Sequence, residues 1–129
     1  MKWLIIGIGG FLGAISRYYL SGWVQNYFLK ETLFPIGTFS VNIFGSLLLG
    51  FFHTLLLEKN IDPSLRLFIN MGFLGAFTTF STFSLETMNL IEDKEYFYSM
   101  INIFMSCVMG LIGVWLGKSL YKMVWGGVA

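Results

Sequence analysis

Two asparagines, each followed by a serine four positions on, are the first candidates for chemistry in this apolar sequence. Thr38, Asn42 and Ser46 are spaced four residues apart, so they form one stripe along a helix. Asn102 and Ser106 repeat that spacing. A serine or threonine can bond back to its own helix, whereas an amide needs several partners. We therefore expect Asn42 and Asn102 to line a wet or ionic pathway.

A cluster of hydroxyl residues at 78–84 reads Thr-Thr-Phe-Ser-Thr-Phe-Ser. Hydroxyl and β-branched residues are poor helix formers, so the cluster predicts a break in a helix near mid-membrane. Such breaks persist only where they are buried in protein or line a cavity. They expose carbonyls that can hold a cation and N–H groups that attract an anion. A continuous tilted helix with back-bonded hydroxyls is the alternative.

Two phenylalanines, Phe80 and Phe83, lie within the cluster and three residues apart, so they share a helix face. A phenyl ring has a positive edge, and two edges turned toward a pathway can contact a small anion without a fixed charge. Packing against lipid or core is the alternative for these rings.

The composition indicates which elements must position these residues. The chain has 129 residues, of which 56% are hydrophobic and 12% charged, with a mean hydropathy of +0.73. A soluble domain carries about 25% charged residues. The net charge of +1 excludes a basic face for nucleic acid, and the single cysteine excludes a disulfide framework within the chain. These values exclude a soluble enzyme and predict a small integral membrane protein.

Four apolar runs, at 3–23, 34–57, 65–91 and 97–125, are long enough to cross a bilayer core of roughly 30 Å. The fold prediction is therefore an all-α membrane protein that forms one domain, 1–129, of four spans. Four spans place both termini on one side. Five basic residues then lie on that side and three on the other (Lys2, Lys59, Arg66, Lys118 and Lys122 against Arg17, Lys30 and Lys94). Because this bias is weak, dual topology is expected to be possible.

Small residues recur four positions apart, as at Gly9 and Gly13 and again at Gly113 and Gly117. Such spacing lets helices approach closely in lipid and favours a homo-oligomer over a lone bundle. The spacing leaves open whether a second copy pairs along the glycine face of the first span, the fourth, or both.

An internal repeat links the two halves. Residues 10–14 recur as 72–76, and the pattern Asn-Ile-Phe-x-Ser-x-x-x-Gly at 42–50 recurs at 102–110. The repeat predicts a duplicated two-helix unit with parallel halves. Inverted symmetry, which is common in transport proteins, would then come from two chains assembled head to tail.

Charged residues are missing from the middle of every span, which argues against proton-coupled transport. Arg17 lies nearer one face, where it either snorkels or draws anions into a vestibule. A small drug-efflux transporter is one alternative, but it would need an acidic residue where the first span has Ile15-Ser16-Arg17. A structural membrane subunit is the other, and it would need neither Asn42 nor the hydroxyl cluster.

Three motifs resemble the Fluc/CrcB family of fluoride channels, and the resemblance covers the whole chain. The first span carries Gly10-x-x-Gly13-Ala14-x-x-Arg17-Tyr18, and the second carries Pro35-x-Gly37-Thr38-x-x-x-Asn42-x-x-Gly45. The third span carries the most specific string, Gly72-x-x-Gly75-Ala76-Phe77-Thr78-Thr79-Phe80-Ser81-Thr82-Phe83-Ser84-x-Glu86.

The resemblance implies an antiparallel, dual-topology homodimer in the bacterial inner membrane with two fluoride pathways. It also implies a central sodium ion held by the carbonyls of Gly75 and Thr78 from each subunit. The pathway it implies is lined from several spans, and the candidates are Arg17, Thr38, Asn42, Phe80, Ser81, Thr82, Phe83, Asn102 and Ser106. Within this set, Ser81 and Thr82 would support the break. The family commonly has a tyrosine where this chain has Asn102.

The chemistry of fluoride agrees with this set of residues. The ion is small and holds water tightly, so a pathway must replace that water with hydrogen-bond donors. Hydroxyls, amides and ring edges do so without a fixed positive side chain, which would trap the ion. Neutral carbonyls suit a hard cation such as sodium, which would supply positive potential at the centre. The sequence thus predicts a passive, selective fluoride channel that relieves fluoride toxicity, and not an enzyme.

Overall fold

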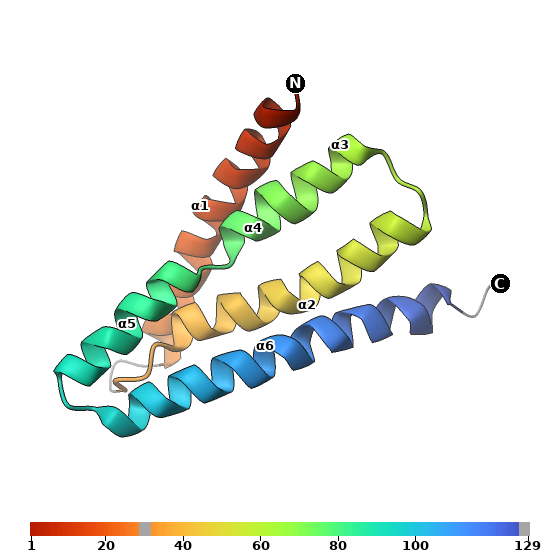
Figure 1. The fold of residues 1–129 in the computed structure, drawn as a ribbon. Coiled ribbons are helices and arrows are strands. Elements are labelled where there is room, and N and C mark those ends of the chain that lie inside the picture. The colour runs from red at the N-terminus through yellow and green to blue at the C-terminus, as the bar shows by residue number, and fades with distance from the viewer. Residues whose placement is uncertain (29–31, 127–129) are drawn as a thin grey trace.

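The structure is a computed structural model that describes residues 1–28 and 32–126, so Lys30 of the charge count lies outside the described residues. The described chain forms four helices that are long and apolar enough to cross a membrane, as expected. The elements in chain order are α1 (Lys2–Phe28), α2 (Ile36–Glu58), α3 (Pro63–Arg66), the π-helix η1 (Leu67–Leu74), α4 (Gly75–Phe77), α5 (Phe80–Glu92) and α6 (Tyr96–Trp125) (Figure 1). The third span combines α3, η1, α4 and α5.

Proline and polar residues set where the spans begin. Pro35 immediately precedes α2, and Pro63 is the first residue of α3. Proline suits a first turn because its missing N–H would have no partner there. The Asp62 carboxylate caps α3 by accepting a hydrogen bond from the Ser64 N–H at 2.9 Å. Asn60 and Lys94 take positive φ values of 48° and 62° in the turns that end the second and third spans.

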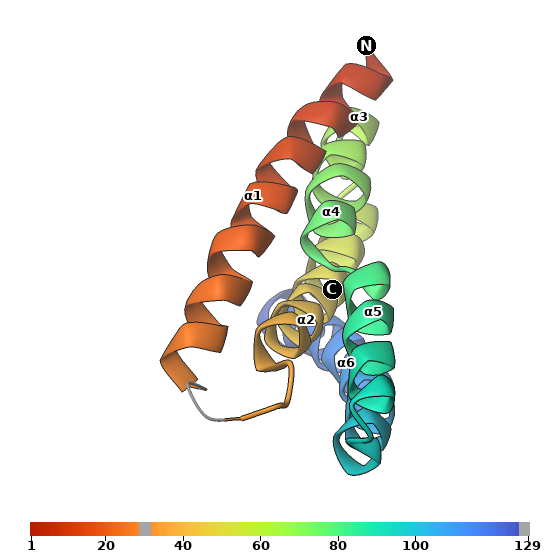
Figure 2. The same cartoon turned by 90° about the vertical axis from the view of Figure 1, so that its left-hand side faces the viewer.

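The helices pack mainly as two pairs, α1 with η1 and α2 with α6. Figure 2 shows α1 beside α4, which directly follows η1. The paired elements contain the repeated motifs, so 10–14 lies on a helix beside 72–76 and 42–50 on a helix beside 102–110. The duplication itself stays a prediction.

Glycine makes both pairings possible. A methyl group at Gly13 would overlap the main-chain carbonyl of Phe73, and one at Gly117 would overlap that of Leu47. Gly50 is similarly close to the carbonyl of Val114. The glycine faces of the first and fourth spans are therefore covered within one chain. Within one chain η1 covers the first of these faces and α2 covers the second, while pairing with a second copy stays a prediction.

The third span changes its backbone geometry twice. Residues Leu67–Leu74 are π-helical, which the sequence pattern did not predict. Between α4 and α5, Thr78 has φ −84° and ψ 156°, and Thr79 has φ −150° and ψ 116°, which are extended conformations. Figure 1 shows this short link, at which the span bends. π-Helical turns in long helices are frequent near functional sites.

Most large apolar side chains face outward. Trp3 is 77% exposed and Phe11 is 65% exposed in the single chain. Among the described residues, the buried apolar side chains are Val24, Val41, Leu56, Leu74, Phe77, Leu90 and Tyr121. A chain that buries so few side chains and exposes so much apolar surface is expected to contact lipid or a protein partner.

Candidate functional site

Asn42 binds the extended link of the third span through both ends of its amide. Its Oδ1 accepts a hydrogen bond from the Thr79 N–H at 2.7 Å, and its Nδ2 donates to the Thr79 carbonyl at 3.0 Å. The side chain thereby replaces the backbone partners that Thr79 lacks outside a helix. One amide hydrogen of Asn42 remains for another acceptor.

Thr79 is a residue of the candidate site that the sequence analysis did not single out. Its side chain is 8% exposed and caps α5, since its hydroxyl oxygen accepts from the Thr82 N–H at 3.2 Å. The same hydroxyl donates to the Thr82 hydroxyl at 3.0 Å and lies 3.3 Å from that of Ser81. The signal that identifies it is a threonine followed three residues later by a second hydroxyl residue, just before an apolar helix.

The carbonyls of Gly75 and Thr78, beside this link, do not accept the hydrogen bonds that a continuous helix would give them. The Thr79 N–H, which a continuous helix would direct to Gly75, goes to Asn42 instead. The Thr82 N–H, which would reach Thr78, goes to the Thr79 hydroxyl. Gly75 is exposed, and Thr78 is half-buried. Neutral carbonyl oxygens of this kind are the donor set that a hard cation prefers, so these residues fit the implied sodium ion.

A groove of about 330 Å³ lies next to the link, between α2, α5 and α6. Phe80 is 80% exposed, and its ring centroid lies 5.5 Å from that of Phe83. The described residues that line the groove carry no charged side chain; they are Asn42, Ser46, Leu49, Thr78, Thr79, Phe80, Phe83, Ser106, Cys107 and Gly110. The structure thus brings four of the predicted pathway residues to one surface (Asn42, Phe80, Phe83 and Ser106).

A second cavity, of about 240 Å³, lies on the other side of Thr79 and contains Arg17, Thr38 and Thr82. It shares Thr79 with the groove, so the capping residue separates the two spaces. Arg17 supplies the positive side chain there. Ser81 is exposed and lines neither space.

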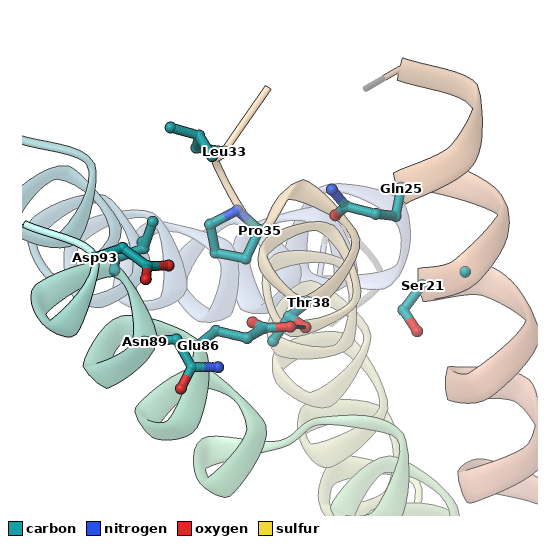
Figure 3. A pocket seen from close by; sticks show the side chains of 10 residues that line it. Ser21, Gln25, Leu33, Pro35, Thr38, Glu86, Asn89 and Asp93 are labelled. Carbon is teal, nitrogen blue, oxygen red and sulfur yellow. Dashed lines mark hydrogen bonds between the residues drawn. The ribbon is translucent and has the colours of Figure 1, made fainter. Parts of the chain in front are cut away.

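A third cavity, of about 430 Å³, lies between the ends of α1, α2 and α5 (Figure 3). Glu86 extends from α5 to Thr38 on α2, whose hydroxyl donates to Glu86 Oε1 at 2.7 Å. Asn89 of α5 and Asp93, which immediately follows that helix, also line the cavity. The contact between Glu86 and Thr38 ties the N-terminal part of α2 to α5.

Comparison with known proteins identifies the family. The family described as CrcB-like protein, Camphor Resistance (CrcB), matches residues 4–118. The chain belongs to the CrcB family. The chain is 40% identical over 123 residues to the fluoride-specific ion channel FluC of a Nitratiruptor species, covering 95% of this chain and 94% of the relative. It is 46% identical over 115 residues to the FluC of Geotalea daltonii, covering 88% and 91% respectively.

These relatives confirm the resemblance drawn from the motifs. Their names are those of ion channels, which agrees with the prediction that this CrcB protein is not an enzyme. Together with the four candidate spans, they show a multi-pass membrane protein.

Asn102, where the resemblance implied a tyrosine, lies behind the groove. Its side chain is 1% exposed, and its Nδ2 donates to the Thr87 hydroxyl at 2.9 Å. Its Oδ1 accepts from the Ser106 hydroxyl at 3.3 Å. Thr87, which sequence reasoning missed, is 6% exposed and donates to the Phe83 carbonyl at 2.7 Å. Asn102 therefore reaches the groove through Ser106.

Proposed function

We propose that this protein is a passive, selective fluoride channel that lets fluoride leave the cytoplasm. The observation that carries the proposal is the groove, which combines hydroxyls, an amide and two aromatic rings and whose described lining has no charged side chain. Such donors replace the water of a small anion without the fixed positive charge that would hold it too tightly. The names of the relatives, fluoride-specific ion channels, support the choice of ion.

The fluoride pathway, in this proposal, passes Phe80, Phe83 and the free amide hydrogen of Asn42. Ser106 and Thr38 add hydroxyl groups, whose protons go to Asn102 Oδ1 and Glu86 Oε1 in the single chain, and Asn102 takes part as the buried partner of Ser106. Arg17 draws anions toward the second cavity, where Thr82 lies. Ser81 and Thr82 stabilise the link through their contacts with the Thr79 hydroxyl.

The third span is, in this proposal, a helix broken near mid-membrane at Thr78 and Thr79. A helix has a partial negative charge at its C-terminus and a partial positive charge at its N-terminus. The end of α4 therefore favours a cation, and the start of α5 favours an anion. The carbonyls of Gly75 and Thr78 would hold a structural sodium ion, which supplies positive potential next to the anion pathway.

The working unit is an antiparallel homodimer, with dual topology in the bacterial inner membrane. Phe80 is 80% exposed and Gly75 is exposed in the single chain. In the proposed dimer, the second copy covers both residues. The carbonyls of one chain are too few to surround a sodium ion, and a second chain would double them. The weak bias of basic residues permits insertion in both orientations.

The first test is ion efflux from liposomes that hold only the purified chain, with an ionophore to clamp the voltage. We expect rapid fluoride release and no chloride release. Release of both ions would refute the selectivity for fluoride. If well-folded protein releases neither ion, the proposed channel function is refuted, and a transporter or a structural subunit is favoured.

Cys107 offers a second test because it is exposed and lines the groove with Phe80 and Phe83. We expect a methanethiosulfonate reagent to block fluoride efflux, since the attached group fills the groove. Cys107→Ser should conduct and resist the reagent. A matched control places the thiol at Leu111→Cys in that background, because Leu111 is 75% exposed on the same helix and outside the groove. Undiminished efflux from fully labelled parent protein would exclude the groove from the pathway.

A further inference from the structure

Four groups on α5 and α6 form a chain of hydrogen bonds that leads from the main chain to the groove. The Phe83 carbonyl accepts from the Thr87 hydroxyl at 2.7 Å, and Thr87 Oγ1 accepts from Asn102 Nδ2 at 2.9 Å. Asn102 Oδ1 accepts from the Ser106 hydroxyl at 3.3 Å. Ser106 is the member of this chain, besides Phe83, that lines the groove.

The direction of the chain is fixed by its first member. A carbonyl can only accept, so the single proton of Thr87 is committed to Phe83. Thr87 can then only accept from Asn102, which turns the amide nitrogen toward Thr87 and Oδ1 toward Ser106. The proton of Ser106 therefore points back to Asn102, and its lone pairs remain on the groove side. In this state Ser106 offers an approaching anion no donor.

We propose that Asn102 is a positioning residue that holds the Ser106 proton away from the groove until an anion competes for it. The inference rests on the proposed fluoride pathway. An anion that enters the groove must compete with a neutral amide oxygen for the proton. A hydrogen bond to a small, charged acceptor is about twice as strong as one between neutral groups, so fluoride wins this competition. A larger anion with diffuse charge gains less from the same exchange.

The test measures fluoride efflux against fluoride concentration for Asn102→Leu and Thr87→Val. Asn102→Leu removes the competing acceptor while keeping the buried volume similar. Thr87→Val is nearly isosteric and frees the amide to turn its nitrogen toward Ser106, so the Ser106 proton again points outward. We expect the half-saturating fluoride concentration to fall about three- to tenfold in each variant, the range that one net hydrogen bond represents.

A double-variant comparison separates positioning from simple stability. Once Ser106→Ala has removed the proton, adding Asn102→Leu should leave the half-saturating concentration where Ser106→Ala placed it. Ser99→Ala is the matched control, because Ser99 is also buried on α6 but bonds back to the Tyr96 carbonyl at 3.1 Å. This control should leave the half-saturating concentration at the parent value.

Two results would overturn the inference while the channel itself stands. An unchanged half-saturating concentration in both folded variants would mean that Asn102 does not govern the Ser106 proton. Equal shifts with and without Ser106 would mean that Asn102 acts through another group. A parent chain that releases no fluoride would instead refute the proposed function on which the inference rests.

Discussion

Liposomes that contain Phe83→Leu or Phe80→Leu protein are expected to release no more fluoride than liposomes without protein. Leucine keeps the apolar bulk at these positions but has no ring, so it lacks the positive edge that a phenyl group turns toward an anion. Both rings line the groove, and their centroids are 5.5 Å apart, so neither can replace the other along the pathway. Fluoride-selective electrodes measure the efflux directly.

The control for this result is Phe104→Leu. Phe104 is 66% exposed on α6 and lies outside the groove, so its loss should leave the efflux at the parental rate. Wild-type efflux from folded Phe83→Leu protein would exclude the aromatic edges as fluoride contacts. It would also strengthen the alternative that these rings pack against lipid or a partner.

Gly13→Ala and Gly117→Ala are expected to prevent assembly of the native fold. A Cβ at Gly13 would overlap the Phe73 carbonyl, and one at Gly117 would overlap the Leu47 carbonyl. Main-chain atoms cannot rotate away as a flexible side chain can, so the paired helices must separate. Overpacking of a side chain costs about 1–3 kcal/mol, and overlap with two rigid backbones exceeds that range. Size-exclusion profiles and thermal unfolding in detergent measure the loss.

Gly22→Ala is the matched control, because a methyl group at that glycine of α1 meets nothing within 4 Å. It should elute and unfold like the parent chain. Parent-like unfolding of Gly13→Ala would mean that α1 does not pack against η1 as described. The Phe73 carbonyl lies only one helical turn before Phe77, so a shift there would also displace the link that Asn42 holds.

The four spans follow from the sequence because hydropathy is a local property. Each run is long and apolar enough to cross the bilayer core whatever it packs against, so the helix count could be predicted residue by residue. The hydroxyl cluster is equally local, since Thr78 and Thr79 are poor helix formers in any context. The stripe of Thr38, Asn42 and Ser46 likewise follows from helical spacing alone.

The tertiary structure decided which neighbour each face meets. Helical spacing shows that Gly9 and Gly13 share a face, but it cannot show that the face is covered by η1 of the same chain. The sequence also shows that burying the amides of Asn42 and Asn102 in lipid costs free energy, but it does not show which groups these amides contact. Asn42 is oriented by Thr79, 37 residues away, and Asn102 by Thr87, 15 residues away. A hydrogen bond has a direction that both partners set, so the sequence determined the polar groups of this protein and only the fold decided which of them donate and which accept.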